Sequence, residues 1–194
     1  MKEIVTEALQ AGIELRQSCL GVIEEPLLAA ASLMVECLRG GGKILVCGNG
    51  GSAADAQHFA GELVNRFEMN RPGLAAIAMT HDASVITSIA NDFSFNDIFS
   101  RQVEALGRPG DLLLAISTSG NSANVIAAAS AAGKTGMKTV ALTGRDGGEL
   151  GRHANVAALL NIDHASTPRV QEMHITCLHI LCTLVDETMF GQPA

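Results

Sequence analysis

The architecture of this chain can be read from one stretch, KILVCGNGGSAADAQHFAGELVNRF, which spans residues 43–67. It opens with a short apolar run, 43–47, passes through a glycine-rich turn and continues as an alanine-rich segment with helical spacing, 52–67. Strand, turn and helix in this order form the repeating unit of α/β proteins. The stretch therefore predicts a buried strand that leads directly into a helix.

The same alternation continues along the chain. Four further apolar runs flanked by turn residues predict strands: 73–79, 111–116, 138–142 and 155–160. Three longer segments predict helices: 82–106, 121–136 and 169–189. Alternating strands and helices favour right-handed connections and parallel pairing. We therefore expect one α/β domain over residues 1–194. It should be a three-layer sandwich with a mostly parallel five-stranded sheet, N-terminal helices and a long C-terminal helix.

Two helical segments precede the first strand. The first covers about 2–20, and the second starts at Pro26, runs to about residue 38 and is ended by the glycines at 40–42. From the residues alone, these helices belong either to the same domain or to an oligomer interface. We take 1–40 as a helical extension of the single domain that packs in an oligomer.

The composition fits one cytoplasmic globular domain. Of 194 residues, 47% are hydrophobic and 17% are charged, which supplies enough apolar material for one full core. The net charge of −7 disfavours nucleic acid and anionic membrane surfaces as partners. No uncharged segment approaches the roughly 20 residues of a bilayer span, and the N-terminus has no export signal. Five cysteines without a C-x-x-C pair are typical of reduced, buried thiols.

Two strand-to-helix loops suit an anion. C-G-N-G-G-S-A, 47–53, follows the first strand, and S-T-S-G-N-S, 117–122, follows the third. Each places small residues, backbone N–H groups and hydroxyls at a helix N-terminus, where a phosphate is stabilised. The alternative is that each loop only makes a turn and caps its helix. Two such loops after neighbouring strands favour a phosphate site.

The first loop also has to be weighed as a nucleotide loop. Gly48, Gly50 and Ala53 match the dinucleotide pattern G-x-G-x-x-A. The match is poor, because Met79-Thr80-His81 stands where the acidic ribose-binding residue is expected. A Walker loop is excluded because G-K-[ST] is missing from the segment.

The helix after the first loop presents a histidine and a carboxylate one turn apart. His58 and Glu62 share a face with Asp55 and Arg66. Beside a bound sugar phosphate, such a pair can hold a divalent metal such as zinc or move protons. The alternative is a solvated face with a Glu62–Arg66 ion pair. The position of the pair, starting at the candidate phosphate loop, favours the functional interpretation.

The final helix offers Gln171, His174 and His179 among apolar neighbours. A lone histidine in such a helix is more often a hydrogen-bonded core residue than a metal ligand. Gln171 and His174 share a face, whereas Gln171 and His179 are about 12 Å apart along a straight helix axis. The spacing alone therefore does not select His179.

Five stretches stand out in combination: CGNGGSAADAQHFAGELVNRF (47–67), ANDFSFNDIFS (90–100), ISTSGNSANVI (116–126), LTGRDGG (142–148) and RVQEMHITCLH (169–179). Together they resemble the sugar isomerase (SIS) family and, within it, the phosphoheptose isomerase family, over nearly the whole chain. The resemblance implies a flavodoxin-like fold and a homotetramer with active sites at subunit interfaces.

The resemblance also implies the site residues. One Zn²⁺ per subunit would be held by His58, Glu62, Gln171 and His179. Contacts to the phosphosugar fall on Asn49, Gly50, Gly51, Ser52, Glu62, Asn91, Asp92, Ser117, Thr118, Ser119, Ser122 and Gln171. Some family members carry an acidic residue at position 168, where this chain has Pro168.

The implied activity is an aldose-ketose isomerisation. D-sedoheptulose 7-phosphate would become D-glycero-D-manno-heptose 7-phosphate for ADP-heptose and lipopolysaccharide core synthesis. We expect an enediol, with Glu62 as base and His179 as acid. One alternative is a non-enzymatic SIS regulator that associates with the replication initiator. The retained Glu62 and His179 disfavour it. Another is an isomerase of a different phosphosugar, such as a pentose 5-phosphate.

Overall fold

The computed structural model describes residues 1–191. Within them lies a five-stranded sheet in the order β2-β1-β3-β4-β5, in which every pairing is parallel. The strands are β1 (Ile44–Gly48), β2 (Ala76–Ala78), β3 (Leu112–Ser117), β4 (Lys138–Gly144) and β5 (Val156–Ile162). The predicted α/β class with a parallel five-stranded sheet is confirmed.

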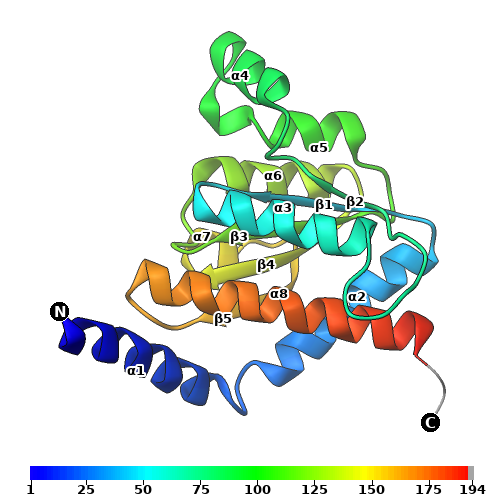
Figure 1. Cartoon of the computed structure of the whole chain (residues 1–194). Coiled ribbons are helices and arrows are strands. Elements are labelled where there is room, and N and C mark those ends of the chain that lie inside the picture. The colour runs from blue at the N-terminus through cyan, green and yellow to red at the C-terminus, as the bar shows by residue number, and fades with distance from the viewer. Residues whose placement is uncertain (192–194) are drawn as a thin grey trace.

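Helices cover both faces of this sheet (Figure 1). They are α1 (Lys2–Cys19), α2 (Glu24–Arg39), α3 (Gly51–Val64), α4 (Ala83–Asp92), the 3-10 turn η1 (Phe95–Asp97), α5 (Ser100–Leu106), α6 (Ala123–Lys134), α7 (Gly148–Gly151) and α8 (Thr167–Phe190). One face packs against α2, α3 and α8, and the other against α5, α6 and α7. The three layers are those expected from the sequence.

Alternate residues of each strand feed two separate cores. On β3, Leu112, Leu114 and Ile116 join the core with α2, α3 and α8, while Leu113 and Ala115 join the core with α5 and α6. All five side chains are buried. Strands buried on both faces are apolar at every position, which explains why the sequence shows continuous apolar runs here and no alternation.

The predicted continuous helix over 82–106 is wrong. The structure divides it into α4, η1 and α5. Helix α4 starts at the cap Asp82, whose carboxylate accepts from Val85 N, and it ends at Phe93, which leaves the helical region at φ −128°. Ser94 then accepts from Asn96 N through its hydroxyl and opens the 3-10 turn. Asn, Asp and Ser compete with helical hydrogen bonding in this way, so they interrupt an otherwise suitable apolar spacing.

Several boundaries also differ from the predictions. Strand β2 has three residues, Ala76–Ala78, where a run over 73–79 was expected. Helix α2 begins at Glu24 and not at Pro26, and α3 ends at Val64, before Arg66 and Phe67. The short helix α7 was not predicted, because four residues are too few to show a helical period.

The N-terminal helices differ in their packing. Helix α2 buries Leu27, Met34 and Val35 in the core, whereas α1 buries only Gly12, Leu15 and Cys19. Within residues 1–191 no single helix has both the length and the apolar content of a membrane span; α1 and α2 reach that composition only as a pair, across a 77° bend.

The cysteines behave as predicted. All five thiols of the chain are free and buried. Burial raises the pKa of Cys47, Cys177 and Cys182 to about 12 each. They pack as apolar side chains and are not activated nucleophiles.

Candidate functional site

The strand order changes direction between β1 and β3, and the two candidate loops follow the carboxyl ends of these strands. The chain turns from β1 into α3 on one face and from β3 into α6 on the other face. In sheets of the order 2-1-3-4-5, this switch between the first and third strands is where ligands bind. Gly48 and Ile116 are paired in the register, so the loops at 49–50 and 118–122 begin side by side.

Two asparagines join these loops. Asn49 Nδ2 donates to Asn124 Oδ1 at 2.8 Å, and Asn124 Nδ2 donates back to Asn49 Oδ1 at 2.9 Å. Asn124 lies in the first turn of α6 and is buried. Because the two amides bond to each other, the Asn49 side chain fixes the distance between the loops.

The second loop concentrates hydroxyl groups. Ser117 Oγ donates to Ser122 Oγ at 3.0 Å and lies 3.5 Å from Ser119 Oγ. Ser122 is the N-cap residue of α6, yet its side chain makes no capping hydrogen bond. Ser117, Ser119 and Ser122 therefore face one another at the positive end of a helix dipole, as an anion requires.

The backbone of this loop rests against the loop after β4. Gly120 has a φ of +66°, and a Cβ added there would overlap Gly147 O. Gly120 O also accepts from Leu150 N at 2.8 Å. Only glycine fits this close approach of two backbones, which fixes the shape of the hydroxyl-rich loop.

Three predicted site residues meet where α3 and α8 lie side by side (Figure 1). His58 Nε2 is 2.9 Å from His179 Nε2 and 3.5 Å from Glu62 Oε1. The His58 and Glu62 side chains are 44% and 26% exposed, so this cluster is open to solvent and to a ligand. Phe67 stacks on the His179 ring with centroids 5.6 Å apart. The packing of the two helices thus places His179 with the pair on α3, which spacing alone did not establish.

The chemistry of this cluster fits zinc, although the set is incomplete. Two imidazoles and a carboxylate are donors that Zn²⁺ prefers. The 2.9 Å separation of the two imidazole nitrogens is a hydrogen-bond distance, so one ring donates a proton that a bound metal would replace. Among residues 1–191, no group of three or more His, Cys, Asp or Glu side chains has the arrangement of a metal site.

Gln171 lies beside the N-terminal end of α3, at the opposite end of this helix from Glu62. A Cβ on Gly51 would overlap the Gln171 side-chain amide, so this amide covers the first turn of α3. Glu62 stands near the last turn of the same helix. The structure therefore does not bring Gln171 to the cluster of His58, Glu62 and His179.

Asn91 and Asp92 are also separate from the cluster. They end α4, at the end of the molecule where this helix projects (Figure 1). Both are exposed, and Asn91 Nδ2 donates to Asp92 Oδ1 at 2.8 Å. Their predicted role in sugar binding depends on a ligand or a second subunit that reaches them.

Two further ionisable groups lie close to these elements. Burial raises the pKa of the Asp55 carboxyl, and His58 opposes this shift. On α8, the buried His174 lies 2.9 Å from Thr143 O through Nε2, and burial lowers its pKa to about 4. His174 is thus a neutral core residue, as expected for a lone histidine on an apolar helix.

Comparisons with known proteins identify the family to which this chain belongs. The SIS domain family matches residues 11–144. A phosphoheptose isomerase from Halorhodospira halophila is 50% identical over 192 residues, which cover 98% of this chain and 97% of that protein. The chain belongs to the phosphoheptose isomerase family. It is an isomerase, and the resemblance drawn from its motifs is confirmed.

Solved structures of the family share the whole fold. The phosphoheptose isomerase from Neisseria gonorrhoeae superposes with a TM-score of 0.91 at 48% identity, covering 96% of this chain and 98% of that one. The phosphoheptose isomerase from Francisella tularensis gives 0.92 at 40% identity, covering 95% and 97%. The agreement includes the N-terminal helices, because so little of either chain is left out.

Position 168 has a local explanation in this member of the phosphoheptose isomerase family. Pro168 occupies the first turn of α8, after the N-cap residue Ser166. Proline is favoured at the first positions of a helix, where its missing N–H costs nothing. The residue therefore starts the helix that carries Gln171 and His179, and it supplies no carboxylate.

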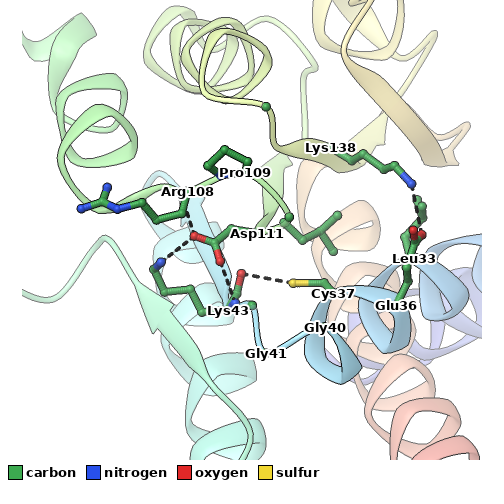
Figure 2. Close-up of a pocket in the computed structure, with 14 residues that line it drawn as sticks. Leu33, Glu36, Cys37, Gly40, Gly41, Lys43, Arg108, Pro109, Asp111 and Lys138 are labelled. Atoms are coloured by element: carbon green, nitrogen blue, oxygen red, sulfur yellow. Dashed lines mark hydrogen bonds and ion pairs between the residues drawn. The ribbon is translucent and has the colours of Figure 1, made fainter.

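A pocket lies at the opposite ends of the strands from the candidate loops (Figure 2). Four of its charged side chains form ion pairs, Lys43 with Asp111 and Lys138 with Glu36, and the Arg108 guanidinium donates to the backbone oxygens of Ala105 and Gly107. Burial alone would raise the pKa of Asp111, but Lys43 and two backbone N–H donors hold it below its usual value. Because these groups already have partners, this pocket is not the candidate active site of the isomerase.

Sequence reasoning missed three residues that hold the site. They are Asn124, which pairs with Asn49; Phe67, which stacks on His179; and Arg71, which bonds to the end of α3. Asn124 falls inside ISTSGNSANVI, one of the motifs that resemble the sugar isomerase family, and this position was the signal that could have found it. No sequence pattern indicated Arg71.

Proposed function

We propose that this protein converts D-sedoheptulose 7-phosphate into D-glycero-D-manno-heptose 7-phosphate in the cytoplasm, for ADP-heptose and lipopolysaccharide core synthesis. The observation that carries the proposal is the convergence of His58, Glu62 and His179 from two helices. Family membership supports the type of reaction, and the name shared by the relatives supports a heptose phosphate as substrate.

The phosphate of the substrate would bind at the hydroxyl-rich loop. Ser117, Thr118, Ser119 and Ser122 offer neutral donors at the N-terminus of α6. The protein carries a net charge of −7, so binding of an anionic sugar depends on these local donors and not on long-range attraction. The remaining sugar contacts are assigned to Asn49, Gly50, Gly51, Ser52, Asn91, Asp92 and Gln171.

The reaction needs one proton to move between carbons and one between oxygens. The Glu62 carboxylate would take the proton from C1 of the ketose and return it to C2. His179 would donate a proton to the C2 oxygen as negative charge develops there, and the deprotonated ring would then accept the proton of the C1 hydroxyl as the aldehyde forms. Phe67 stacks on the His179 ring, which supports a fixed orientation for this acid.

We assign one zinc ion per subunit as a resident cofactor, because imidazole and carboxylate donors suit this metal. His58, Glu62 and His179 would hold it, and Gln171 would become the fourth ligand only after leaving its place over the first turn of α3. When bound, zinc polarises the sugar oxygens. Glu62 would then contact both metal and substrate, so its protonation and position matter for both.

We place four copies of the chain in the working enzyme. Helix α1 presents Ile4, Leu9 and Ile13 to solvent at 61%, 66% and 49% exposure, which supports burial against another subunit. The separation of Asn91 and Asp92 from the cluster on α3 and α8 supports a site that a neighbouring subunit completes.

A substrate panel tests the activity. Purified protein is supplied with sedoheptulose 7-phosphate, fructose 6-phosphate and ribulose 5-phosphate, and aldose formation is followed. We expect turnover of the heptulose phosphate above the others. Turnover of the pentulose phosphate alone would transfer the assignment to another phosphosugar, and turnover of none would favour a regulator.

The variant Glu62→Gln tests the assigned base. We expect kcat to fall by about 10²–10⁴-fold, because the amide cannot accept the carbon-bound proton. The side chain is 26% exposed, so the fold should be retained, as checked by circular dichroism. The exposed Glu104→Gln on α5 is the matched control and should keep full activity. A folded, zinc-containing Glu62→Gln protein with normal turnover would remove Glu62 from the mechanism.

A further inference from the structure

A buried ion pair joins the end of α3 to α8. Arg71 Nε donates to Asp186 Oδ1 at 2.8 Å, and the two side chains are 1% and 3% exposed. Arg71 belongs to the segment between α3 and β2, and Asp186 lies on α8. No residue of this pair belongs to the phosphosugar or zinc contacts assigned above.

The rest of the Arg71 guanidinium binds the last turn of α3. Its Nη2 donates to Glu62 O at 2.9 Å, and its Nη1 donates to Leu63 O at 2.7 Å and to Pro72 O at 3.1 Å. The final carbonyls of a helix have no helical partner, and a cation there also complements the helix dipole. Arg71 therefore caps α3 at the residue proposed as the catalytic base.

The other end of the pair is tied to the proposed acid. Asp186 follows His179 by seven residues, or about two helical turns, so the two lie along the same side of α8. One guanidinium thus bonds to the backbone of Glu62 and to the helix that carries His179. We propose that the Arg71–Asp186 pair is a positioning device that sets the register of α3 against α8, and thereby holds His58 and Glu62 opposite His179.

The geometry of the cluster makes this register important. The 2.9 Å separation joins His58 on α3 to His179 on α8. The 3.5 Å separation joins His58 to Glu62, one turn further along α3. Metal–ligand distances tolerate only about 0.2 Å, and an error of about 1 Å in a reacting group costs on the order of 100-fold in rate. One residue of helical slip corresponds to about 1.5 Å, which exceeds both limits.

A role in stability alone is a weaker account of the pair. Two buried charges lose their hydration, and replacing such a pair by apolar residues of similar size is often neutral for stability. Asp186 Oδ2 is buried without a hydrogen-bond partner within residues 1–191, so the carboxylate is not fully compensated. A register role predicts instead that function is lost while the fold is kept.

The test is the double variant Arg71→Met with Asp186→Leu, which removes both charges and leaves neither one unpaired. The inference rests on the proposed function. We expect thermal unfolding near that of the wild type, a zinc dissociation constant raised by about 10–100-fold and kcat lowered by about 100-fold, with a smaller change in KM. The visible spectrum of the Co²⁺-substituted protein should also change, because it reports ligand geometry.

Two further variants distinguish a positioning role of the Arg71–Asp186 pair from general damage to the folded protein. Asp186→Asn keeps the volume but removes the negative charge and so weakens the contact with Arg71 Nε; it should change zinc affinity and kcat in the same direction, and it serves if the double variant does not fold. Asp111→Asn makes the same chemical change in the Lys43–Asp111 pair at the far ends of the strands (Figure 2) and should leave the cobalt spectrum and zinc affinity unchanged.

A folded double variant with wild-type zinc affinity, kcat and cobalt spectrum would overturn the inference. If the wild-type protein neither binds zinc nor isomerises the heptulose phosphate, the proposed function fails instead. A crystal structure of the double variant then decides the register: an unchanged His58–His179 separation overturns the positioning role, and a displaced one supports it.

Discussion

His174 shows how burial decides what a single histidine does. It shares α8 with His179, yet its side chain is fully buried while His179 meets solvent and His58. Its Nε2 lies 2.9 Å from Thr143 O, and its Nδ1 is buried without a partner within residues 1–191. A charged imidazole is unfavourable in this position, which is why burial lowers its pKa to about 4 from 6.5.

This shift predicts a dependence of stability on pH. Between pH 6.5 and 4 the unfolded chain binds a proton at residue 174 that the folded protein does not bind. The contribution of His174 to the free energy of unfolding should therefore fall as the pH falls through this window, by about 3 kcal/mol in total. Urea unfolding at pH 7 and pH 4.5, at one fixed protein concentration, measures it.

The variant His174→Gln isolates this contribution. Its amide can still donate to Thr143 O but does not titrate, so the stability gap between wild type and variant should narrow by roughly 2–3 kcal/mol on going from pH 7 to pH 4.5. All other titrating groups are shared and cancel in the difference. An unchanged gap would mean that His174 is protonated as easily in the folded protein as in the unfolded one.

At the scale of elements, the loop after β3 depends on a contact between two backbones. Gly120 meets Gly147 and Gly148 so closely that a Cβ would lie 2.5 Å from the Gly147 carbonyl carbon. We expect Gly120→Ala to lower the free energy of unfolding by more than about 4 kcal/mol, or to prevent folding, because neither backbone can move aside cheaply.

Gly21→Ala is the matched control for this prediction. Gly21 also has a positive φ, +76° against +66° for Gly120, but an added Cβ would meet nothing within 4 Å. Its cost should be only the conformational penalty of about 1–2 kcal/mol. Chemical denaturation of both variants gives the comparison. Equal losses would show that φ alone, and not the contact with Gly147, restricts residue 120.

The elements themselves were predictable to different degrees. The runs of β1 and β3 are apolar up to the final Ser117 of β3, because helices bury both of their faces, and this left a clear signal. The break at Phe93 depends on local bonding by Ser94, which competes with a helical apolar spacing.

Spacing on one helix placed His58 beside Glu62, whereas His179 joins them only through the packing of α3 on α8. Arg71 and Asp186, 115 residues apart, gave no signal at all.

At the scale of the whole molecule, α1 exposes apolar side chains that a second subunit would bury. Figure 1 shows α1 extending along α8, away from the sheet. Val5, Leu9 and Ile13 remain largely exposed on it, and a groove between α1, α2 and α8 is lined by apolar side chains such as Leu20, Leu28 and Ile180. Apolar surface of this extent on one side is typical of a subunit interface.

The variant Leu9→Lys with Ile13→Lys tests this interface and its link to activity. Charges placed on an apolar interface are costly to bury, so we expect light scattering to change from a mass of four chains of 20.2 kDa to a smaller species. Isomerase activity should fall by about 100-fold, because under the proposed function each site would lose the Asn91 and Asp92 that a neighbouring subunit supplies. Gln10→Lys with Gln17→Lys adds two lysines at exposed polar positions of α1 and should keep both mass and activity.

A dissociated protein with full activity would mean that each chain carries a complete site. A wild-type protein that scatters as one chain would leave the apolar side of α1 without its proposed partner.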